Sequence, residues 1–178
     1  MSLTSKQYVY ILLIIMSKRK DSVVKGDAAE LSRYEVAHCS ECTCFNLRKA
    51  TRVVQNLFDE AFRTIGLKGT QFTVLSHIFS YGPITLTKLA DIMLLDRTTL
   101  ARNLAPLEKK GFIEINPGSD LRTRYIDITE KGRRLLSKAL PLWEKTQEKI
   151  KNGLGDQKWN SMISNISELI SQVQNNQK

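Results

Sequence analysis

The chain has 178 residues, of which 42% are hydrophobic and 25% are charged, and its formal net charge is +9 at pH 7. This length is enough to bury a hydrophobic core and suits one domain, or one domain with accessory helices. The excess of lysine and arginine points to a polyanionic partner, although charge does not identify a fold. The odd, low count of three cysteines excludes a secreted disulfide scaffold, so we expect a cytoplasmic protein.

Residues 1–38 form an N-terminal extension whose structure the sequence does not define. Within it, Tyr8–Met16 is a strongly apolar run. A transmembrane helix needs roughly 20 apolar residues, so this run is too short to span a membrane. It is also a poor signal peptide, because the positive charges of Lys18–Lys20 follow the run and no small-residue cleavage site comes next. We therefore expect no membrane partner. We expect the run to form a helix or strand that packs on the protein or on a partner.

The rest of the chain alternates between two kinds of apolar spacing. Residues that recur every three or four positions predict helices, and strict alternation predicts strands. In chain order, we predict helices from Cys44 to Ile65, from Thr70 to Gly82, from Thr85 to Met93 and from Arg97 to Gly111, strands at Phe112–Asn116 and Thr123–Ile128, and helices from Thr129 to Gly153 and from Trp159 to Val173. The expected N-caps are Thr70, Asp96 and Thr129, and the expected helix stops are Gly66, Gly82, Gly111, Gly153 and Gly155.

This order of elements predicts a mainly α fold with a small β-hairpin wing, a winged helix-turn-helix. Ala90 is small where two helices must cross closely, and the apolar contacts between them are expected from Leu86, Leu89, Leu100 and Leu104. The outer face of the second helix would then present Arg97, Thr98, Thr99, Arg102 and Asn103. Arginine can pair bidentately with guanine and asparagine with adenine, while threonine can contact a thymine methyl or a phosphate. These residue types indicate recognition of double-stranded DNA.

The hairpin adds two arginines, Arg122 and Arg124. A narrow minor groove concentrates negative potential, which arginine at a wing tip can exploit. Asp120 is close enough in sequence to pair with Arg122 and fix its direction. Helix-turn-helix, basic wing and net charge together favour a DNA-binding protein, either a sequence-specific regulator or a protein that packages DNA without sequence preference.

The stretch SDLRTRYIDITEKG resembles the wing signature of MarR-type regulators, D-x-R-x(5)-[LI]-T-x-x-G, through Asp120, Arg122, Ile128, Thr129 and Gly132. LLDRTTLARNLAPLEKKGFI is similar to the recognition helix of the same family, and the resemblance covers about Cys42 to Val173. It implies a homodimer in which residues 39–66 and 131–178 form dimerisation helices that flank a DNA-binding domain at 67–130. Two recognition helices would then enter successive major grooves of a near-palindromic operator.

The resemblance also implies how such a protein acts, more often as a repressor than as an activator. In this family, small aromatic acids often bind between the dimer helices and the DNA-binding lobe. His77 and Tyr81 would line such an inducer pocket here. The isolated position of His77 is also typical of a histidine that only packs.

All three cysteines, Cys39, Cys42 and Cys44, fall within CSECTC, directly after His38. TCFNLRKATR resembles the first helix of the peroxide-sensing, OhrR-like branch of the family, where a reactive cysteine precedes a phenylalanine as Cys44 does here. That branch places tyrosines from the following helix near the thiol, and Gly69–Phe72 contains none. Cys39 or Cys42 would be the resolving thiol. The alternatives are a metal site that uses His38 and the three cysteines, and a structural role as small apolar side chains.

No catalytic motif is present: the sequence contains no G-x-S-x-G, no Walker loop and no H-E-x-x-H. A thiol oxidoreductase that uses Cys42 and Cys44 is a further alternative, but no thioredoxin-like βαβ pattern surrounds them. We therefore expect a DNA-binding transcriptional regulator without a cofactor, and not an enzyme.

Overall fold

A computed structural model describes residues 38–118 and 123–176 of the chain. The chain divides into two compact units, Met1–Ala50 and Thr51–Lys178, and each is described by itself. The apolar run Tyr8–Met16 lies outside the described residues. Among the helices that are described, none combines the length and apolarity that crossing a membrane requires.

The first unit contains the 3-10 helix η1 (His38–Glu41) and the first turns of α3 (Thr43–Phe62). Asn46 joins the two, because its side-chain Nδ2 donates to the carbonyl oxygens of Ser40, at 2.9 Å, and Cys42, at 3.0 Å. The helix predicted from Cys44 is confirmed and begins one residue earlier.

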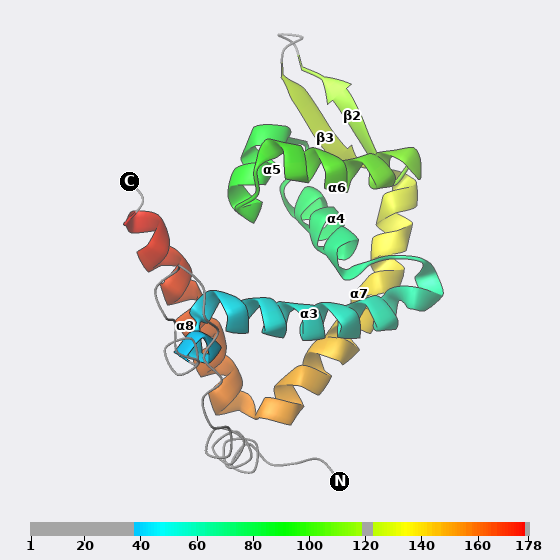
Figure 1. Cartoon of the computed structure of the whole chain (residues 1–178). Coiled ribbons are helices and arrows are strands. Elements are labelled where there is room, and N and C mark those ends of the chain that lie inside the picture. The colour runs from blue at the N-terminus through cyan, green and yellow to red at the C-terminus, as the bar shows by residue number, and fades with distance from the viewer. Residues whose placement is uncertain (1–37, 119–122, 177–178) are drawn as a thin grey trace, which may run out of the picture. The chain divides into compact units, whose positions relative to one another are not determined.

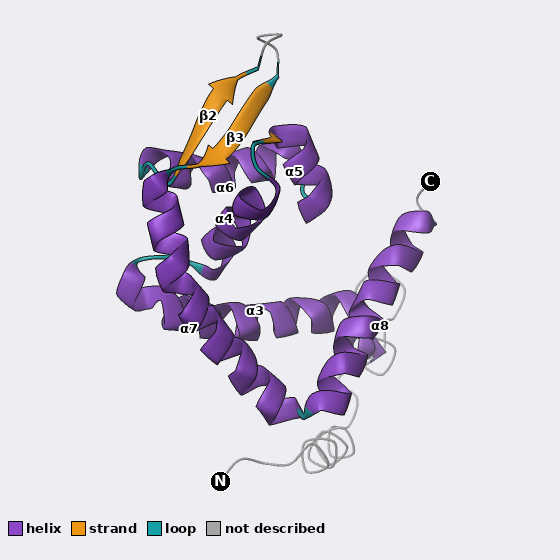
Figure 2. Cartoon of the chain, turned by 180° about the vertical axis from the view of Figure 1, so that it is seen from behind, coloured by secondary structure: helices purple, strands orange, loops and turns teal. Residues whose placement is uncertain are grey.

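The second unit holds the rest of α3 and all later elements, shown in chain order by the colours of Figure 1. These elements are η2 (Arg63–Ile65), α4 (Gly69–Tyr81), β1 (Ile84–Thr85), α5 (Leu86–Met93), α6 (Arg97–Lys109), β2 (Ile113–Pro117), β3 (Arg124–Ile128), α7 (Glu130–Leu154) and α8 (Asp156–Asn175). The predicted mainly α fold with a hairpin wing is confirmed. Figure 2 shows β2 and β3 extending beyond the helices α5 and α6.

The sheet has three antiparallel strands in the order β1-β3-β2, one more than the predicted hairpin. The hairpin register pairs Ile113 with Ile128 at its base and Pro117 with Arg124 toward its tip. The added strand β1 pairs Ile84 with Ile126 on the other edge of β3. A two-residue strand has no periodicity to detect, so the sequence did not reveal it.

Two of the three predicted N-caps, Asp96 and Thr129, are confirmed, and Thr85, which was predicted as the first residue of its helix, is an N-cap instead. Thr85 caps α5, and Asp96 caps α6 by accepting from the amide and the hydroxyl of Thr99 at 2.8 and 2.6 Å. Thr129 caps α7 by accepting from the Gly132 amide at 3.1 Å. The prediction that Thr70 caps α4 was wrong.

The N-cap of α4 is Lys68, and the first amides of that helix find acceptors elsewhere. The Gly69 amide donates to Asp59 Oδ1 on α3 at 2.6 Å, and the Lys68 amide donates to Gln71 Oε1 at 3.1 Å. Because the carboxylate of Asp59 comes from ten residues upstream, only tertiary structure brings it to the start of α4.

Four of the five predicted glycine stops are confirmed, because Gly66, Gly82 and Gly155 are C-caps and Gly111 follows the C-cap of α6. Gly66 follows η2 in a left-handed conformation, with φ of 66°. Gly155 has φ of 80° and separates α7 from α8, whereas Gly153 lies inside α7. The prediction that Gly153 breaks the helix was therefore wrong: one glycine weakens a helix without ending it.

The core lies where α4, α5, α6 and the sheet meet. The predicted close crossing of α5 and α6 is confirmed, because Ala90 is buried beside Leu89, Leu100 and Leu104. A row of aromatic rings in contact extends the core toward α7. These rings are Phe58, Phe62, Phe72 and Trp143, with successive centroids 6.0, 5.1 and 6.1 Å apart.

The glycine of the wing signature has a steric role. A Cβ atom at Gly132 would overlap the carbonyl oxygen of Phe112 and Cγ1 of Ile128.

We expect Gly132→Ala to lower the free energy of unfolding by about 1–3 kcal/mol, the usual cost of overpacking. Gly153→Ala is the control, because a Cβ there meets open space. It should raise the unfolding free energy by about 0.5–1 kcal/mol, because alanine favours the helix. Urea unfolding at one protein concentration measures both, and equal effects would contradict the steric argument.

The cap of α6 makes stability depend on pH. The hydrogen bond from the Thr99 hydroxyl, and then that from its amide, hold the pKa of Asp96 below its ordinary value of 3.8. The cap therefore stabilises the fold above that value and is lost as the pH falls through the lowered pKa. We expect the stability advantage of the parent over Asp96→Asn in urea unfolding to shrink as the pH falls from about 5 through the lowered pKa of Asp96.

Asp91→Asn is the control for this titration, because Asp91 is an exposed carboxylate inside α5 rather than at a helix start. A parallel pH dependence in the two variants would show that the cap is not the source.

Candidate nucleic-acid interface

The helix-turn-helix consists of α5, a short turn and α6. Leu94 ends α5 in a left-handed conformation, with φ of 51°, and Leu95 donates its amide to the Ala90 carbonyl at 3.0 Å. A left-handed conformation is unfavourable for leucine. The packing of α5 and α6, which flank Leu94, must therefore impose this backbone conformation. The turn brings Asp96 to the start of α6 and so sets which face of that helix points outward.

The outward face of α6 carries most of the residues predicted to read DNA. Arg97, Thr98 and Arg102 are exposed, and Asn103 is half-buried. Ala101 and Ala105 are also exposed between them. Small side chains there leave the backbone of α6 accessible to a close partner surface.

Thr99 has a second role that the sequence did not indicate. Its side chain is half-buried, and its hydroxyl donates to the Asp96 carboxylate. This bond holds the first turn of α6 together, so Thr99 orients the neighbouring residues of the predicted interface.

The wing contributes one described arginine. Arg124 is exposed at the outer end of β3, and Tyr125 beside it is 40% exposed. The Gly118 amide donates to the Thr123 carbonyl at 2.7 Å, which closes the described part of the hairpin. Asp120 and Arg122 lie outside the described residues.

Lys88 is a further exposed cation that the sequence reading passed over. It lies in the first turn of α5, and its amide donates to the cap residue Thr85 at 3.2 Å. In helix-turn-helix proteins the first helix crosses the DNA backbone. The sequence did contain a signal for Lys88 as a phosphate contact, because it places a lysine in the first turn of the helix that precedes the recognition helix.

The three cysteines have free thiols and are exposed. Cys42 directly precedes α3, and Cys44 lies in its first turn. The Cys42 amide donates to the Cys39 carbonyl at 3.2 Å, so the backbone folds back over this short segment. Within residues 38–118 and 123–176, no group of three His, Cys, Asp or Glu side chains is arranged to hold a metal ion, so nothing here supports the metal alternative.

His77 and Tyr81 occupy successive turns of α4. Nδ1 of His77 lies 2.7 Å from the Thr73 carbonyl, and its ring centroid is 6.2 Å from that of Tyr81. His77 is half-buried and Tyr81 is 57% exposed. On the same helix, Phe79 lies beneath the guanidinium of Arg133, which comes from α7, at 5.5 Å. The two predicted pocket residues are thus neighbours on α4.

Comparison with known proteins agrees with this architecture. The model of the MarR family matches residues 67–122, which run from the end of η2 into the wing. A Bacillus cereus protein described as an uncharacterised HTH-type transcriptional regulator is 34% identical over 95 residues, 53% of this chain and 63% of the relative. The chain thus spans less than two thirds of the length of the curated relatives it matches.

Solved structures match over more of the chain. The M. tuberculosis transcriptional regulator MosR, solved in complex with DNA, is 34% identical, with a TM-score of 0.68, and the match covers 75% of this chain and 96% of MosR. The S. aureus MepR–DNA complex is 16% identical with a TM-score of 0.67, a likeness of fold alone. The B. cereus relative and MosR are both described as transcriptional regulators. Because MosR is covered over almost its whole length at this identity, the chain belongs to the MarR family of winged-helix transcriptional regulators.

Proposed function

We propose that the chain is a homodimeric regulator, acting as a repressor, that binds a near-palindromic double-stranded DNA operator through α6 and the wing. The observation that carries this proposal is the outward face of α6. Arg97, Thr98 and Arg102 are exposed there, in the same compact unit as Arg124 on the wing. The arrangement suits insertion of a helix into the major groove while the wing reaches the neighbouring backbone or minor groove.

Each residue has a role that follows from its chemistry. Arg102 and Asn103 are suited to base edges, because a guanidinium can bind guanine bidentately and an amide can bind adenine. Arg97 and Thr98, in the first turn of α6, can contact bases or phosphates, and Lys88 on α5 can neutralise a phosphate. Arg124 acts with the predicted wing-tip pair Asp120 and Arg122.

The proposed dimer rests on apolar surface that the second unit leaves uncovered. One stripe on α8 recurs at spacings of three and four residues and is 36–47% exposed. It consists of Ile163, Ile166, Ile170 and Val173. Val53 on α3 is 70% exposed. A second copy of the chain would remove this surface from water, and a two-fold dimer would place two α6 helices on half-sites about 10 bp apart.

Two substitutions separate base reading from backbone binding. Using a duplex selected by the parent from a random pool, Arg102→Ala should cost about 1–3 kcal/mol of binding free energy and relax sequence preference. Arg124→Ala should weaken binding to all sequences alike and reduce the salt slope by about one. Fluorescence anisotropy at several salt concentrations measures both.

Lys158→Ala is the matched control, because it removes one exposed cation from α8. It should leave affinity and salt slope near those of the parent. The assigned interface is wrong if no sequence is enriched from the pool. It is also wrong if Arg124→Ala and Lys158→Ala both bind like the parent and Arg102→Ala keeps the full sequence preference.

We propose further that thiol oxidation releases the operator. The supporting observation is that Cys44 is exposed in the first turn of α3, with Cys39 and Cys42 exposed a few residues before it. Thiolates near helix N-termini are stabilised by the positive end of the helix dipole. An organic hydroperoxide would convert Cys44 to a sulfenic acid, which condenses with Cys39 or Cys42 to a disulfide and releases water.

Oxidation should therefore abolish binding of the selected duplex by the parent, and dithiothreitol should restore it. Cys44→Ser should keep its affinity in the presence of the same hydroperoxide, as measured by anisotropy. If the oxidised parent binds as tightly as the reduced protein, release must come from a small ligand instead. The surface around His77 and Tyr81 is then the candidate inducer site.

A further inference from the structure

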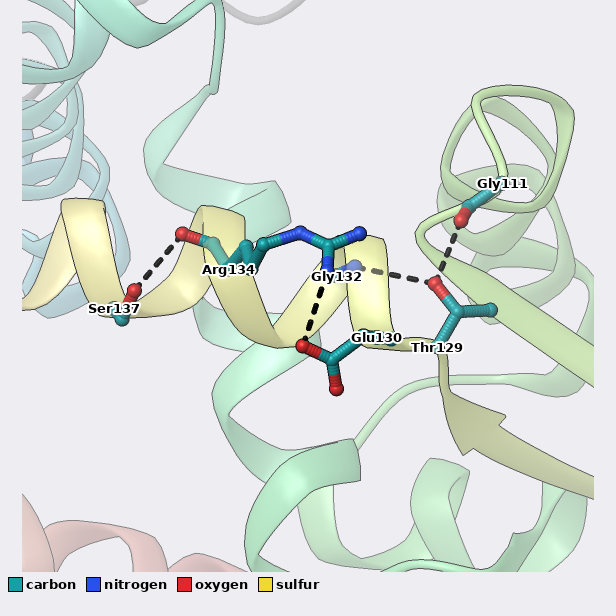
Figure 3. A network of polar contacts seen from close by, with 6 residues as sticks. All are labelled: Gly111, Thr129, Glu130, Gly132, Arg134 and Ser137. Carbon is teal, nitrogen blue, oxygen red and sulfur yellow. Dashed lines mark hydrogen bonds and ion pairs between the residues drawn. The ribbon is translucent and has the colours of Figure 1, made fainter.

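The start of α7 is bonded to the end of the recognition helix through one hydroxyl group. Thr129 Oγ1 accepts from the Gly132 amide at 3.1 Å and donates to the Gly111 carbonyl at 2.7 Å, as Figure 3 shows. The first bond caps α7. The second reaches across 18 positions of sequence to the residue that follows α6 and its C-cap.

Neighbouring residues reinforce this contact. The Thr129 amide donates to the Phe112 carbonyl at 3.1 Å. The ammonium group of Lys131 donates to the Lys110 carbonyl at 2.7 Å and lies 5.2 Å from the centroid of the Phe112 ring. Gly132 packs so closely on Phe112 that a Cβ atom would not fit. We call this set of contacts, between 110–112 and 129–132, the junction.

The junction lies where three functional parts of the molecule meet. Residues 110–112 connect α6 to β2, and Thr129 connects β3 to α7. The first pair of the hairpin register, Ile113 with Ile128, lies directly next to it. The junction therefore helps to set the angle between α7 and the DNA-reading parts, together with the packing of Trp143 and Arg133 of α7 on Phe72 and Phe79 of α4.

Capping alone does not account for Thr129. Asp96 caps α6 by accepting hydrogen bonds only, which shows that an acceptor is enough for that task. The carbonyl of Gly111 needs a donor, which an ionised carboxylate cannot supply. A hydroxyl group does both, so its second bond points to a role beyond helix initiation.

We infer that Thr129 is a positioning residue: its hydroxyl fixes α6 and the wing to α7, so that a shift of α7 in the dimer moves the DNA-reading face with it. This inference rests on the proposed function. It assigns a specific task to the threonine of the wing signature, which is distinct from the steric task of Gly132.

The test compares Thr129→Val, which removes both bonds at equal size, with Thr129→Ser, which keeps the hydroxyl. Thr146→Val is the matched control, because Thr146 is on α7 too and donates to the Leu142 carbonyl within that helix. Binding to the duplex selected by the parent is measured by anisotropy, well below the unfolding temperature of every variant. Amide hydrogen exchange of residues 110–113 is measured without DNA.

We expect Thr129→Val to lose roughly threefold to tenfold in affinity, in line with loss of the bond to the Gly111 carbonyl that joins α7 to the end of α6. Its salt dependence should become shallower as the wing disengages. Its amides at 110–113 should exchange faster. Thr129→Ser and Thr146→Val should match the parent in affinity and salt slope. Parental affinity and salt slope for Thr129→Val, or equal losses for Thr129→Val and Thr146→Val, would overturn the inference.

If Thr129→Val does not fold, Thr129→Asp serves instead, because aspartate caps helices but cannot donate to Gly111. Ser137→Asp adds the same charge to the exposed face of α7 and is its control. Weaker binding by Thr129→Asp than by Ser137→Asp supports the inference, and equal binding overturns it. If the parent selects no sequence, the proposed function fails, while the exchange measurement still decides whether the hydroxyl holds the junction.

Discussion

The burial of one leucine stripe on α6 determines the rest of the DNA-binding unit. Leu100, Leu104 and Leu107 recur at spacings of four and three and are buried. Each such side chain contributes roughly 1.5–3 kcal/mol when it leaves water, so the helix cannot rotate about its axis without a large loss. With that face fixed inward, Arg102 is necessarily on the outward face, and Arg97 is exposed at the first position of the helix.

The basic residues of this chain fall into two groups that net charge does not distinguish. Lys110 and Lys131 donate to backbone carbonyls, Lys110 to Gly66 at 3.5 Å and Lys131 to Lys110 at 2.7 Å. They satisfy acceptors near the C-terminal ends of helices, where cations are favourable. Arg102 and Arg124 lie instead on exposed faces of the reading elements. The net charge of +9 therefore does not tell which basic side chains are available to phosphates.

Local signals located most of the elements correctly. Asp96 and Thr129 were predictable as caps, and Gly66 as a stop, because each acts within one helical turn of its own position. The alternation in the hairpin was predictable because one face of it is buried. For the candidate site, the same reasoning identified the outward residues of α6, but it did not reveal that the Thr99 hydroxyl bonds to Asp96.

The sequence by itself thus determined which segments are helices and strands, which face of α6 is polar, and the family to which the signature around Thr129 and Gly132 belongs. Tertiary structure alone decided the features that depend on residues distant in the chain. It added β1 to the sheet, brought Asp59 to the first amide of α4, and aimed the Thr129 hydroxyl at Gly111. The physical reason is that caps and periodicity act within one or two turns, whereas a hydrogen bond or a close approach between elements exists only after burial has placed them together.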